Sequence, residues 1–254
     1  MVMKPIKSRI LLYDLEVSRE VVEGYRNKYE FNVVKVLRHQ FMMSYSYKWL
    51  GEKTIHFRHM HGYEDMKSFV QSLRDLEDEA DITIAHNLRR FDDVMGNRFY
   101  IEHGIDPPSP YKTIDTLQVA RSTFKFPGNS LNQLAEFLGI GKKEKITYAD
   151  IETDFINNPT WSVINKLKKY NNKDVELLEG IYLKMRPYMK NHPNLAVMGD
   201  STGCPKCQGH NVQYNGLRYT NTMVYRRVFC KDCRSWFKER QSDKDIQNKP
   251  DFVN

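Results

Sequence analysis

The chain has 254 residues, 40% of them hydrophobic, which is enough to bury the core of one ordinary domain plus a smaller unit. It contains no apolar run of the ~18 residues that a membrane helix needs and no apolar signal segment at its start, so we expect a cytoplasmic protein without a membrane partner. The net charge is +7, and residues 204–254 carry ten Lys/Arg against five Asp/Glu. This basic end favours a polyanionic partner, although basic surfaces also serve solubility alone.

The first predicted strand ends in two acidic residues. Residues 11–16 read LLYDLE, so Asp14 and Glu16 alternate with apolar residues. Because successive side chains of a strand point to opposite faces, the two acids lie on the same face. Neighbouring carboxylates repel each other, and a bound cation is the usual compensation. The alternative is that both acids are solvated where the strand leaves the sheet.

The next segments predict a mixed α/β order. Acidic and polar residues at 18–30 precede one β-rich stretch over 33–49, and Gly51–Glu52 turns it into a strand over 53–57. Apolar residues at helical spacing predict a helix over 63–76, and residues 82–85 predict a short buried strand. The predicted order is therefore strand, strand, strand, helix, strand.

A second group of polar residues follows the strand over 82–85. Asp92 lies on the carboxyl side of that strand, and α/β sheets collect their chemistry at this edge. However, Asp92 and Asp93 also suit the first turn of a helix through residue 101, where acids complement the helix dipole. Asp115, after a possible strand at 113–117, is better explained as the N-cap of the next helix.

Two later helices carry further polar residues. Residues 130–141 predict an amphipathic helix with a glycine stop, and the lysines after it either contact phosphates or complement the helix end. A long helix is predicted from Asn158–Pro159, with Asn171–Asn172 as a bend or break. Tyr170 and Asp174 are four residues apart and so share one face of it. A solvated Tyr and Asp would have the same spacing.

Taken together, these motifs resemble a known family. Asp14-x-Glu16, Asn87-x-x-x-Phe91-Asp92 and Tyr170-x-x-x-Asp174 resemble, in this order, the three motifs of the DEDD exonucleases. The tyrosine is typical of the DEDDy branch, alongside proofreading exonuclease domains and ribonuclease D. The stretches YDLEVS and SYKWLGEK are similar to small stand-alone exonucleases of bacteriophages, which would place the protein in a host cytoplasm. The resemblance covers residues 8–190, including a helix that ends in LGIGKK.

The resemblance implies an α/β fold with an RNase H-like mixed β-sheet flanked by helices. It implies a 3′–5′ exonuclease that releases 5′-mononucleotides, from mainly single-stranded DNA more than from RNA. The four carboxylates of Asp14, Glu16, Asp92 and Asp174 would hold two Mg²⁺ or Mn²⁺ ions, and Tyr170 would align the attacking water. Asn87 and Phe91 are expected to contact the substrate. Val17 departs from the threonine that many members have after the glutamate, and Asp92 fits the motif spacing better than Asp93.

All four cysteines lie near the C-terminus. Cys204, Cys207, Cys230 and Cys233 form a C-x2-C-x22-C-x2-C pattern, which predicts one structural Zn²⁺ with four thiolate ligands. Asn215–Gly216 predicts a tight hairpin turn between the two cysteine pairs, followed by a strand over 223–229 and a short one at 235–237. We therefore expect a small β zinc ribbon.

The role of this ribbon remains open from the sequence. Aromatic and basic residues alternate in it, and Arg227 and Trp236 are candidate contacts to single-stranded nucleic acid. The same residues could form its core and solvated surface, or the ribbon could dock onto a replication protein such as a polymerase. The expected domains are an exonuclease domain over 1–195, the zinc ribbon over 196–240 and a disordered tail over 241–254. Three other functions compete: trimming of RNA 3′ ends like ribonuclease D, a non-catalytic nucleic-acid or replication-protein adaptor, and a structure-selective endonuclease.

Overall fold

A five-stranded mixed sheet forms the centre of residues Arg9–Ile181 in the computed structural model, which describes residues 8–143, 148–198, 202–221 and 223–240. The strand order is β5-β4-β1-β6-β7, and β1 runs parallel to β6 but antiparallel to β4. The predicted RNase H-like mixed sheet is thereby confirmed. Its strands are β1 (Ile10–Val17), β4 (Met42–Trp49), β5 (His56–His59), β6 (Ile82–Ala85) and β7 (Lys112–Asp115).

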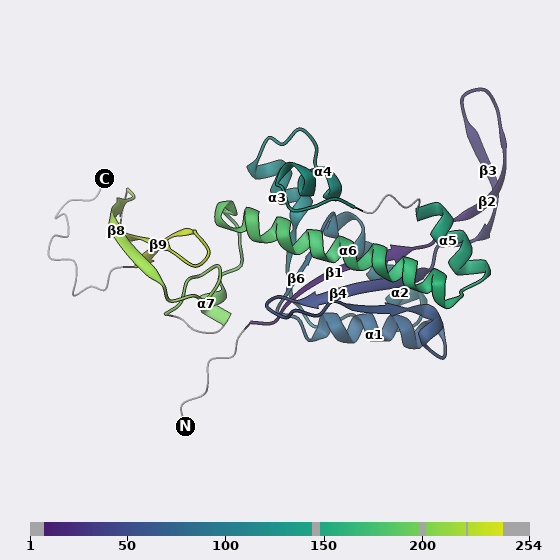
Figure 1. Cartoon of the computed structure of the whole chain (residues 1–254), viewed down its shortest axis with the longest axis horizontal. Coiled ribbons are helices and arrows are strands. Elements are labelled where there is room, and N and C mark those ends of the chain that lie inside the picture. The colour runs from purple at the N-terminus through teal and green to yellow at the C-terminus, as the bar shows by residue number, and fades with distance from the viewer. Residues whose placement is uncertain (1–7, 144–147, 199–201, 222, 241–254) are drawn as a thin grey trace. The chain divides into compact units, whose positions relative to one another are not determined.

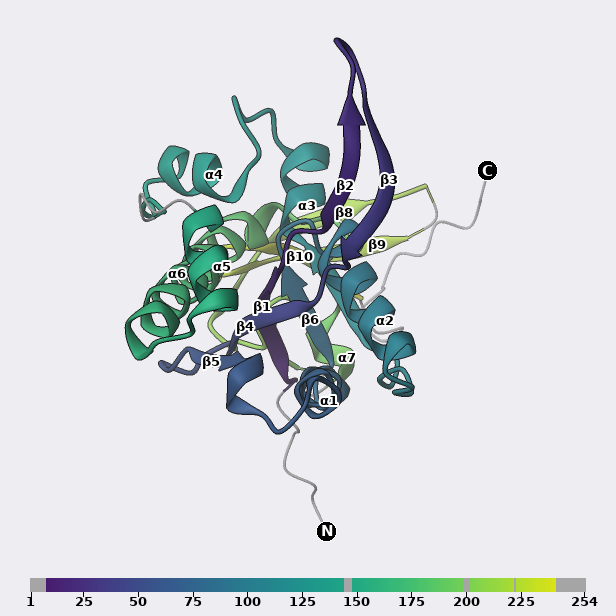
Figure 2. The ribbon, with the colours of Figure 1, turned by 90° about the vertical axis from the view of Figure 1, so that its right-hand side faces the viewer.

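Helices cover both faces of this sheet (Figures 1 and 2). Tyr13 and Leu15 of β1 pack with α1 and α2 in one core, whereas Met43 of β4 packs with α5 and α6 in another. Because side chains alternate along β1, its acids point to the α6 side. The helices are α1 (Met66–Asp78), α2 (Asp92–Glu102), α3 (Thr116–Thr123), α4 (Leu131–Phe137), α5 (Tyr148–Asn157) and α6 (Trp161–Met185), with short 3₁₀ turns at Met60–Gly62, Leu88–Arg90 and Arg186–Tyr188.

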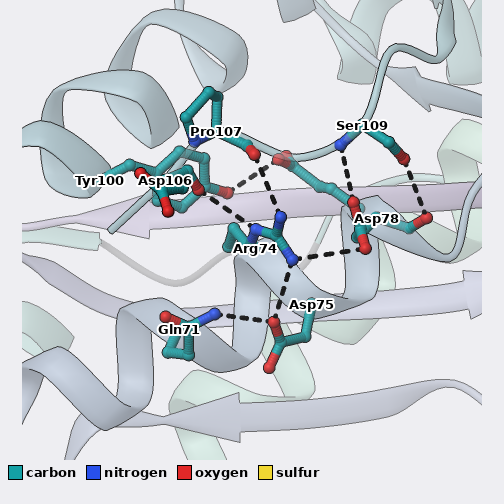
Figure 3. Close-up of polar contacts among 9 residues, drawn as sticks. Gln71, Arg74, Asp75, Asp78, Tyr100, Asp106, Pro107 and Ser109 are labelled. Atoms are coloured by element: carbon teal, nitrogen blue, oxygen red, sulfur yellow. Dashed lines mark hydrogen bonds and ion pairs between the residues drawn. The ribbon is translucent and has the colours of Figure 1, made fainter. Parts of the chain in front are cut away.

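Polar contacts fix the loop that leads from α2 to β7 (Figure 3). The Arg74 guanidinium of α1 donates to the carbonyl oxygens of Asp106 and Pro107, at 3.1 Å each. Asp78, one turn later, accepts from the Ser109 backbone N–H at 2.7 Å. These bonds satisfy backbone groups of an irregular segment and so place β7, which ends at Asp115, on the sheet edge.

Several sequence predictions were wrong in detail. The single β-rich stretch is two strands, β3 (Phe31–Arg38) and β4, and the predicted order also omits β2 (Val21–Arg26). The strands β2 and β3 form a separate two-stranded hairpin whose side chains are mostly exposed, so they lack the buried face that sequence alternation detects. Helix α6 is continuous through Asn171–Asn172, because both side chains bond to serines of β4 instead of to the helix backbone.

The second compact unit begins at Tyr182. Its three-stranded antiparallel sheet has the order β10-β9-β8, with β8 at Val212–Tyr219, β9 at Val224–Cys230 and β10 at Trp236–Arg240, and it also contains α7 (Leu195–Met198). The hairpin turn predicted at Asn215–Gly216 is wrong, since these residues form a bulge inside β8 and the chain reverses between Thr220 and Met223. Gly216 has φ +74°, a backbone conformation that suits glycine in a bulge as well as in a turn. Residues 241–254, the predicted tail, lie outside the described residues.

Candidate metal and nucleic-acid sites

Three acidic side chains from β1 and α6 meet at the sheet. Asp14, Glu16 and Asp174 each offer one carboxylate oxygen, and these oxygens lie within 4.8 Å of one another. Strand alternation places the first two on the α6 side of β1, and the buried Asp174 faces them from the helix. The structure therefore brings together residues that are 160 positions apart in the chain.

Asp92 approaches the same group from the start of α2. Its carboxylate is buried and accepts a hydrogen bond from the Leu15 N–H at 3.3 Å. That N–H is available because β1 pairs with β6 only as far as Leu12. Asp92 lies near Asp14, although outside the group of three oxygens described above, whereas Asp93 lies near Tyr13 on the opposite face of β1.

Burial and mutual repulsion make these carboxyl groups weak acids. Burial is the larger cause, and the charge of Asp174 adds to it, so that the pKa of Asp14 rises to about 7. Burial also raises the pKa of Glu16 and of Asp92 above the usual range. Such a group of half-buried and buried acids needs a positive charge to ionise, and carboxylate oxygens are the ligands of hard divalent cations, so the residues present fit a metal site.

Lys143 supplies one positive charge to this site. Its Nζ lies 2.5 Å from the Asp174 carboxylate, which opposes the rise that burial causes in the pKa of Asp174. The sequence predicted two alternative roles for this lysine, a contact to phosphate or a charge that complements the helix end. The contact depends on how the loop after α4 packs against α6, for which the sequence gives no signal.

Two more residues, missed from the sequence, hold the acids in place. Asn171 donates from Nδ2 to the Asp14 carboxylate at 2.8 Å and to the Asp14 carbonyl oxygen at 3.1 Å. The Tyr148 hydroxyl donates to the carbonyl oxygen of Val17 at 2.9 Å, directly after Glu16. The one signal for Asn171 in the sequence was an asparagine next to the apolar stripe of a long helix.

Tyr170 lies at the edge of the acidic group. Its ring centroid is 5.8 Å from that of Tyr148 and 5.3 Å from Lys143 Nζ. Burial raises the pKa of Tyr170 to about 12, with Lys143 acting in the opposite direction. The phenol therefore keeps its proton at neutral pH and can donate a hydrogen bond.

A cleft of about 690 Å³ adjoins Asp14 and Lys143. Asn87 lines it from a left-handed backbone conformation, φ 71°, together with the cations Arg90 and Arg121. Phe91, the other predicted substrate contact, is 36% exposed and is not among the residues that line this cleft.

His86 also lines the cleft, and its ring forms hydrogen bonds with Thr116 and with the Asn129 carbonyl oxygen. Burial lowers the pKa of His86 to about 4, so the ring is neutral there.

Asp115 is not part of this group. Its carboxylate accepts from the backbone N–H groups of Leu117 and Gln118 as the cap of α3, which confirms the capping interpretation. It also accepts from the N–H groups of Asn87 and Arg89 and thereby orders the loop that lines the cleft.

The second unit brings all four cysteines together. Their sulfur atoms lie within 4.8 Å of one another, and the Sγ atoms of Cys204 and Cys233 are 3.6 Å apart. The Sγ atoms of Cys207 and Cys230 are 3.7 Å apart. A tetrahedron with Zn–S bonds of ~2.3 Å has edges of ~3.8 Å, so this thiol set fits one Zn²⁺.

A basic cleft of about 860 Å³ also lies in this unit. Arg227 and Trp236 both line it, with the Trp236 side chain 51% exposed and its ring 5.0 Å from Phe229. Arg227 donates from Nε to the Asn215 carbonyl oxygen at 3.0 Å, which holds the guanidinium over the bulge in β8. The other basic residues that line the cleft are Lys190, Lys206, Arg218 and Lys238.

Comparisons with known proteins show a family match and a fold likeness. A family profile described as RNase_H superfamily matches residues 35–186. The fold resembles that of the family B DNA polymerase from the hyperthermophilic archaeon Pyrobaculum calidifontis, with a TM-score of 0.53 and 14% sequence identity over 71% of this chain. This match covers only 25% of the polymerase chain. No curated protein sequence matches, and none of the described helices is both long and apolar enough to cross a bilayer.

Proposed function

Because the chain belongs to the RNase H superfamily, we propose that it is a divalent-metal-dependent 3′–5′ exonuclease that acts on single-stranded nucleic acid. The observation that carries this proposal is the convergence of Asp14, Glu16 and Asp174, with Asp92 beside Asp14. These four carboxylates would hold two Mg²⁺ or Mn²⁺ ions, which when bound would supply Lewis-acid activation of a water and stabilisation of the leaving 3′ oxygen in phosphodiester hydrolysis.

The protein's own residues have separate roles in this reaction. The neutral phenol of Tyr170 orients the attacking water towards the terminal phosphate. Lys143, which is next to Asp174, and the cations Arg90 and Arg121 of the cleft attract the phosphates of the strand. Asn171 and Tyr148 hold β1 so that Asp14 and Glu16 keep their orientation.

The direction and the preferred substrate rest on similarity. The Tyr170-x-x-x-Asp174 spacing is typical of the branch that removes nucleotides from 3′ ends. The likeness to a DNA polymerase favours DNA over RNA and a replication protein as a partner. Trimming of RNA 3′ ends by the same site is the main alternative.

The C-terminal unit would be a zinc ribbon that binds the same strand. Its cysteine geometry fits one Zn²⁺, and its cleft combines Trp236 with several cations. Aromatic rings beside cations suit stacking and phosphate contacts with single-stranded nucleic acid.

One assay tests the catalytic proposal. The protein is incubated with 5′-labelled single-stranded DNA, duplex DNA and RNA, each with Mg²⁺, Mn²⁺ or a chelator. We expect stepwise shortening of single-stranded DNA with either metal and none with the chelator. Asp14→Asn, Glu16→Gln, Asp92→Asn and Asp174→Asn should each nearly abolish it, whereas the matched control Asp93→Asn should keep it. A folded Asp92→Asn protein with full activity would instead assign the role to Asp93.

A further inference from the structure

The β2–β3 hairpin extends from the same end of β1 as the acidic residues. Residues 18–20 alone separate β1 from β2, and β3 leads back into β4, whose Met42 pairs with Val17. Within the part of the chain that the structure describes, β2 and β3 pair only with each other, and the hairpin stands out from the main sheet (Figures 1 and 2). The eight residues of β3 span ~26 Å at ~3.3 Å per residue. We call residues 21–38 the arm.

The arm exposes three aromatic rings among basic side chains. Tyr25 is 64% exposed, Tyr29 84% and Phe31 52%. The arm contains four basic residues, Arg26, Lys28, Lys35 and Arg38, and two acidic ones, Glu23 and Glu30. Its net charge is therefore positive, and its rings are open to a partner.

Local contacts order the turn at Tyr29 and the position of the Phe31 ring. The Asn27 side chain accepts from the backbone N–H groups of Tyr29 and Glu30, at 2.9 and 2.7 Å, which orders the turn that presents Tyr29. Phe31 lies across Gly24, where an added Cβ would come within 2.9 Å of the ring. Holding exposed rings in fixed places reduces the ordering cost of stacking a base on them.

A cleft of about 410 Å³ lies at the base of the arm. Arg38 lines it, with its guanidinium 5.5 Å from the Phe41 ring and its buried Nε without a hydrogen-bond acceptor among the described residues. Glu152 also lines the cleft, but both of its oxygens already bond to Arg19, at 2.7 Å from the backbone N and 2.6 Å from Nε. Glu20, the other acidic residue of the lining, lies 3.1 Å from His39 Nδ1. Arg38 is therefore available to an external anion, and a buried donor favours acquiring an acceptor.

This cleft is close to the acidic site. Tyr148 and Glu152 are four residues apart on α5, so they are neighbours on one face of the helix, with their Cβ atoms ~6 Å apart. Tyr148 contacts Val17 beside the acids, and Glu152 holds Arg19 in the cleft. A strand that enters the acidic site can therefore continue past α5 onto the arm.

We propose that the arm and its basal cleft bind the nucleic-acid strand on the 5′ side of the nucleotide that is being removed, with Arg38 on a phosphate and the three aromatic rings stacked on bases. This inference rests on the proposed function. Aromatic rings interleaved with cations are the usual way in which proteins bind single strands. The arm would therefore increase the affinity for long strands without taking part in bond cleavage.

Kinetics on two substrate lengths tests the inference. The steady-state kcat and KM are measured with a dinucleotide and with a ~20-nucleotide single-stranded DNA, and the Kd of the longer strand by fluorescence anisotropy in chelator. The triple variant Tyr25→Ala, Tyr29→Ala, Phe31→Ala should raise KM and Kd for the longer strand by at least about 10- to 100-fold, since even one stacked base contributes a factor of that order. Arg38→Gln should raise them less and reduce their salt dependence. Neither should change kcat/KM for the dinucleotide.

A matched variant separates stacking from protein docking. The control is a second triple variant that removes exposed aliphatic side chains of the same arm, Val33→Ala, Val34→Ala, Leu37→Ala. It should leave KM and Kd for the longer strand, and kcat/KM for the dinucleotide, unchanged. Unchanged long-strand KM and Kd in the aromatic variant, or an equal loss in the aliphatic one, would overturn the inference and leave the arm as a protein contact. If the unaltered protein cleaves neither substrate, the proposed function fails, while the anisotropy comparison still decides the role of the arm.

Discussion

The role of Tyr170 can be tested by removing a single atom, its hydroxyl oxygen. Its ring stands near Lys143 and the acids, and its phenol keeps its proton at neutral pH. If this hydroxyl orients water, Tyr170→Phe should lower kcat about 10²- to 10⁴-fold without weakening metal binding. Calorimetric titration with Mn²⁺ and a kcat measurement on the same variant check both halves. Normal turnover in the variant would make Tyr170 a packing residue.

Glu77 is a buried acid on the other face of β1. It is 2% exposed and accepts from the Tyr100 hydroxyl at 2.8 Å, with Tyr13, Tyr111 and Asp93 nearby. Burial, the largest cause, raises the pKa of Glu77 to about 7, so the folded protein binds a proton that the unfolded chain releases at lower pH. This contribution to stability is therefore present at low pH and is lost as pH rises through 7.

We predict that the free energy of unfolding falls between pH 5 and pH 8 by up to ~3 kcal/mol because of Glu77, at 1.36 kcal/mol per pKa unit. Glu77→Gln should remove that fall and be the more stable protein at pH 8, whereas Glu64→Gln at an exposed site should behave like the unaltered chain. Urea unfolding at several pH values measures the difference. An equal pH dependence in the unaltered and Glu77→Gln proteins would show that Glu77 does not titrate with a raised pKa in the folded state.

Residue-level predictability followed local patterns. Alternation along one strand was enough to pair Asp14 with Glu16, and helical spacing to pair Tyr170 with Asp174. Lys143, Asn171 and Tyr148 reach the same site only because a loop and two helices pack together. No local period encodes such contacts, so the sequence left the lysine ambiguous and missed the other two.

At the scale of elements, strands with a buried face were predicted and the exposed arm was not. β6 and the first half of β1 are buried on both faces, whereas β2 and β3 have almost no buried side chains. The Asn215–Gly216 pair shows a related limit, because a positive φ serves a bulge as readily as a turn. α5 was missed because it follows a polar segment without a clear start signal.

The second unit should depend on zinc. Structural zinc contributes ~10–16 kcal/mol to the folding free energy of small zinc domains. A three-stranded sheet of this size cannot stay folded after losing that much stability. We expect one equivalent of Zn²⁺ per chain by elemental analysis, lost in Cys207→Ser together with protease resistance of residues 202–240. Lys231→Ala, between the last two cysteines, is the matched control and should keep both. A zinc-free native protein with an intact second unit would rule out the structural role.

At the scale of the whole molecule, charge is uneven. Residues 204–254 hold five of the seven excess positive charges, whereas every candidate catalytic residue lies before them. Removing residues 201–254 should therefore preserve cleavage of a dinucleotide but weaken binding of a long strand. The salt slope of binding should also fall by ~0.7 for each phosphate contact that is lost. Arg227→Ala and Trp236→Ala in the full chain provide the same test without truncation, and unchanged affinity and slope would point to protein docking instead.

The most direct test of the central claim is a time course with one single-stranded DNA labelled at either end, in Mg²⁺. We expect a 3′-terminal label to appear at once as a mononucleotide, while the 5′-labelled strand shortens one nucleotide at a time. Asp174→Asn should show neither product. Internal fragments at early times, or mononucleotides released first from the 5′ end, would contradict a 3′–5′ exonuclease.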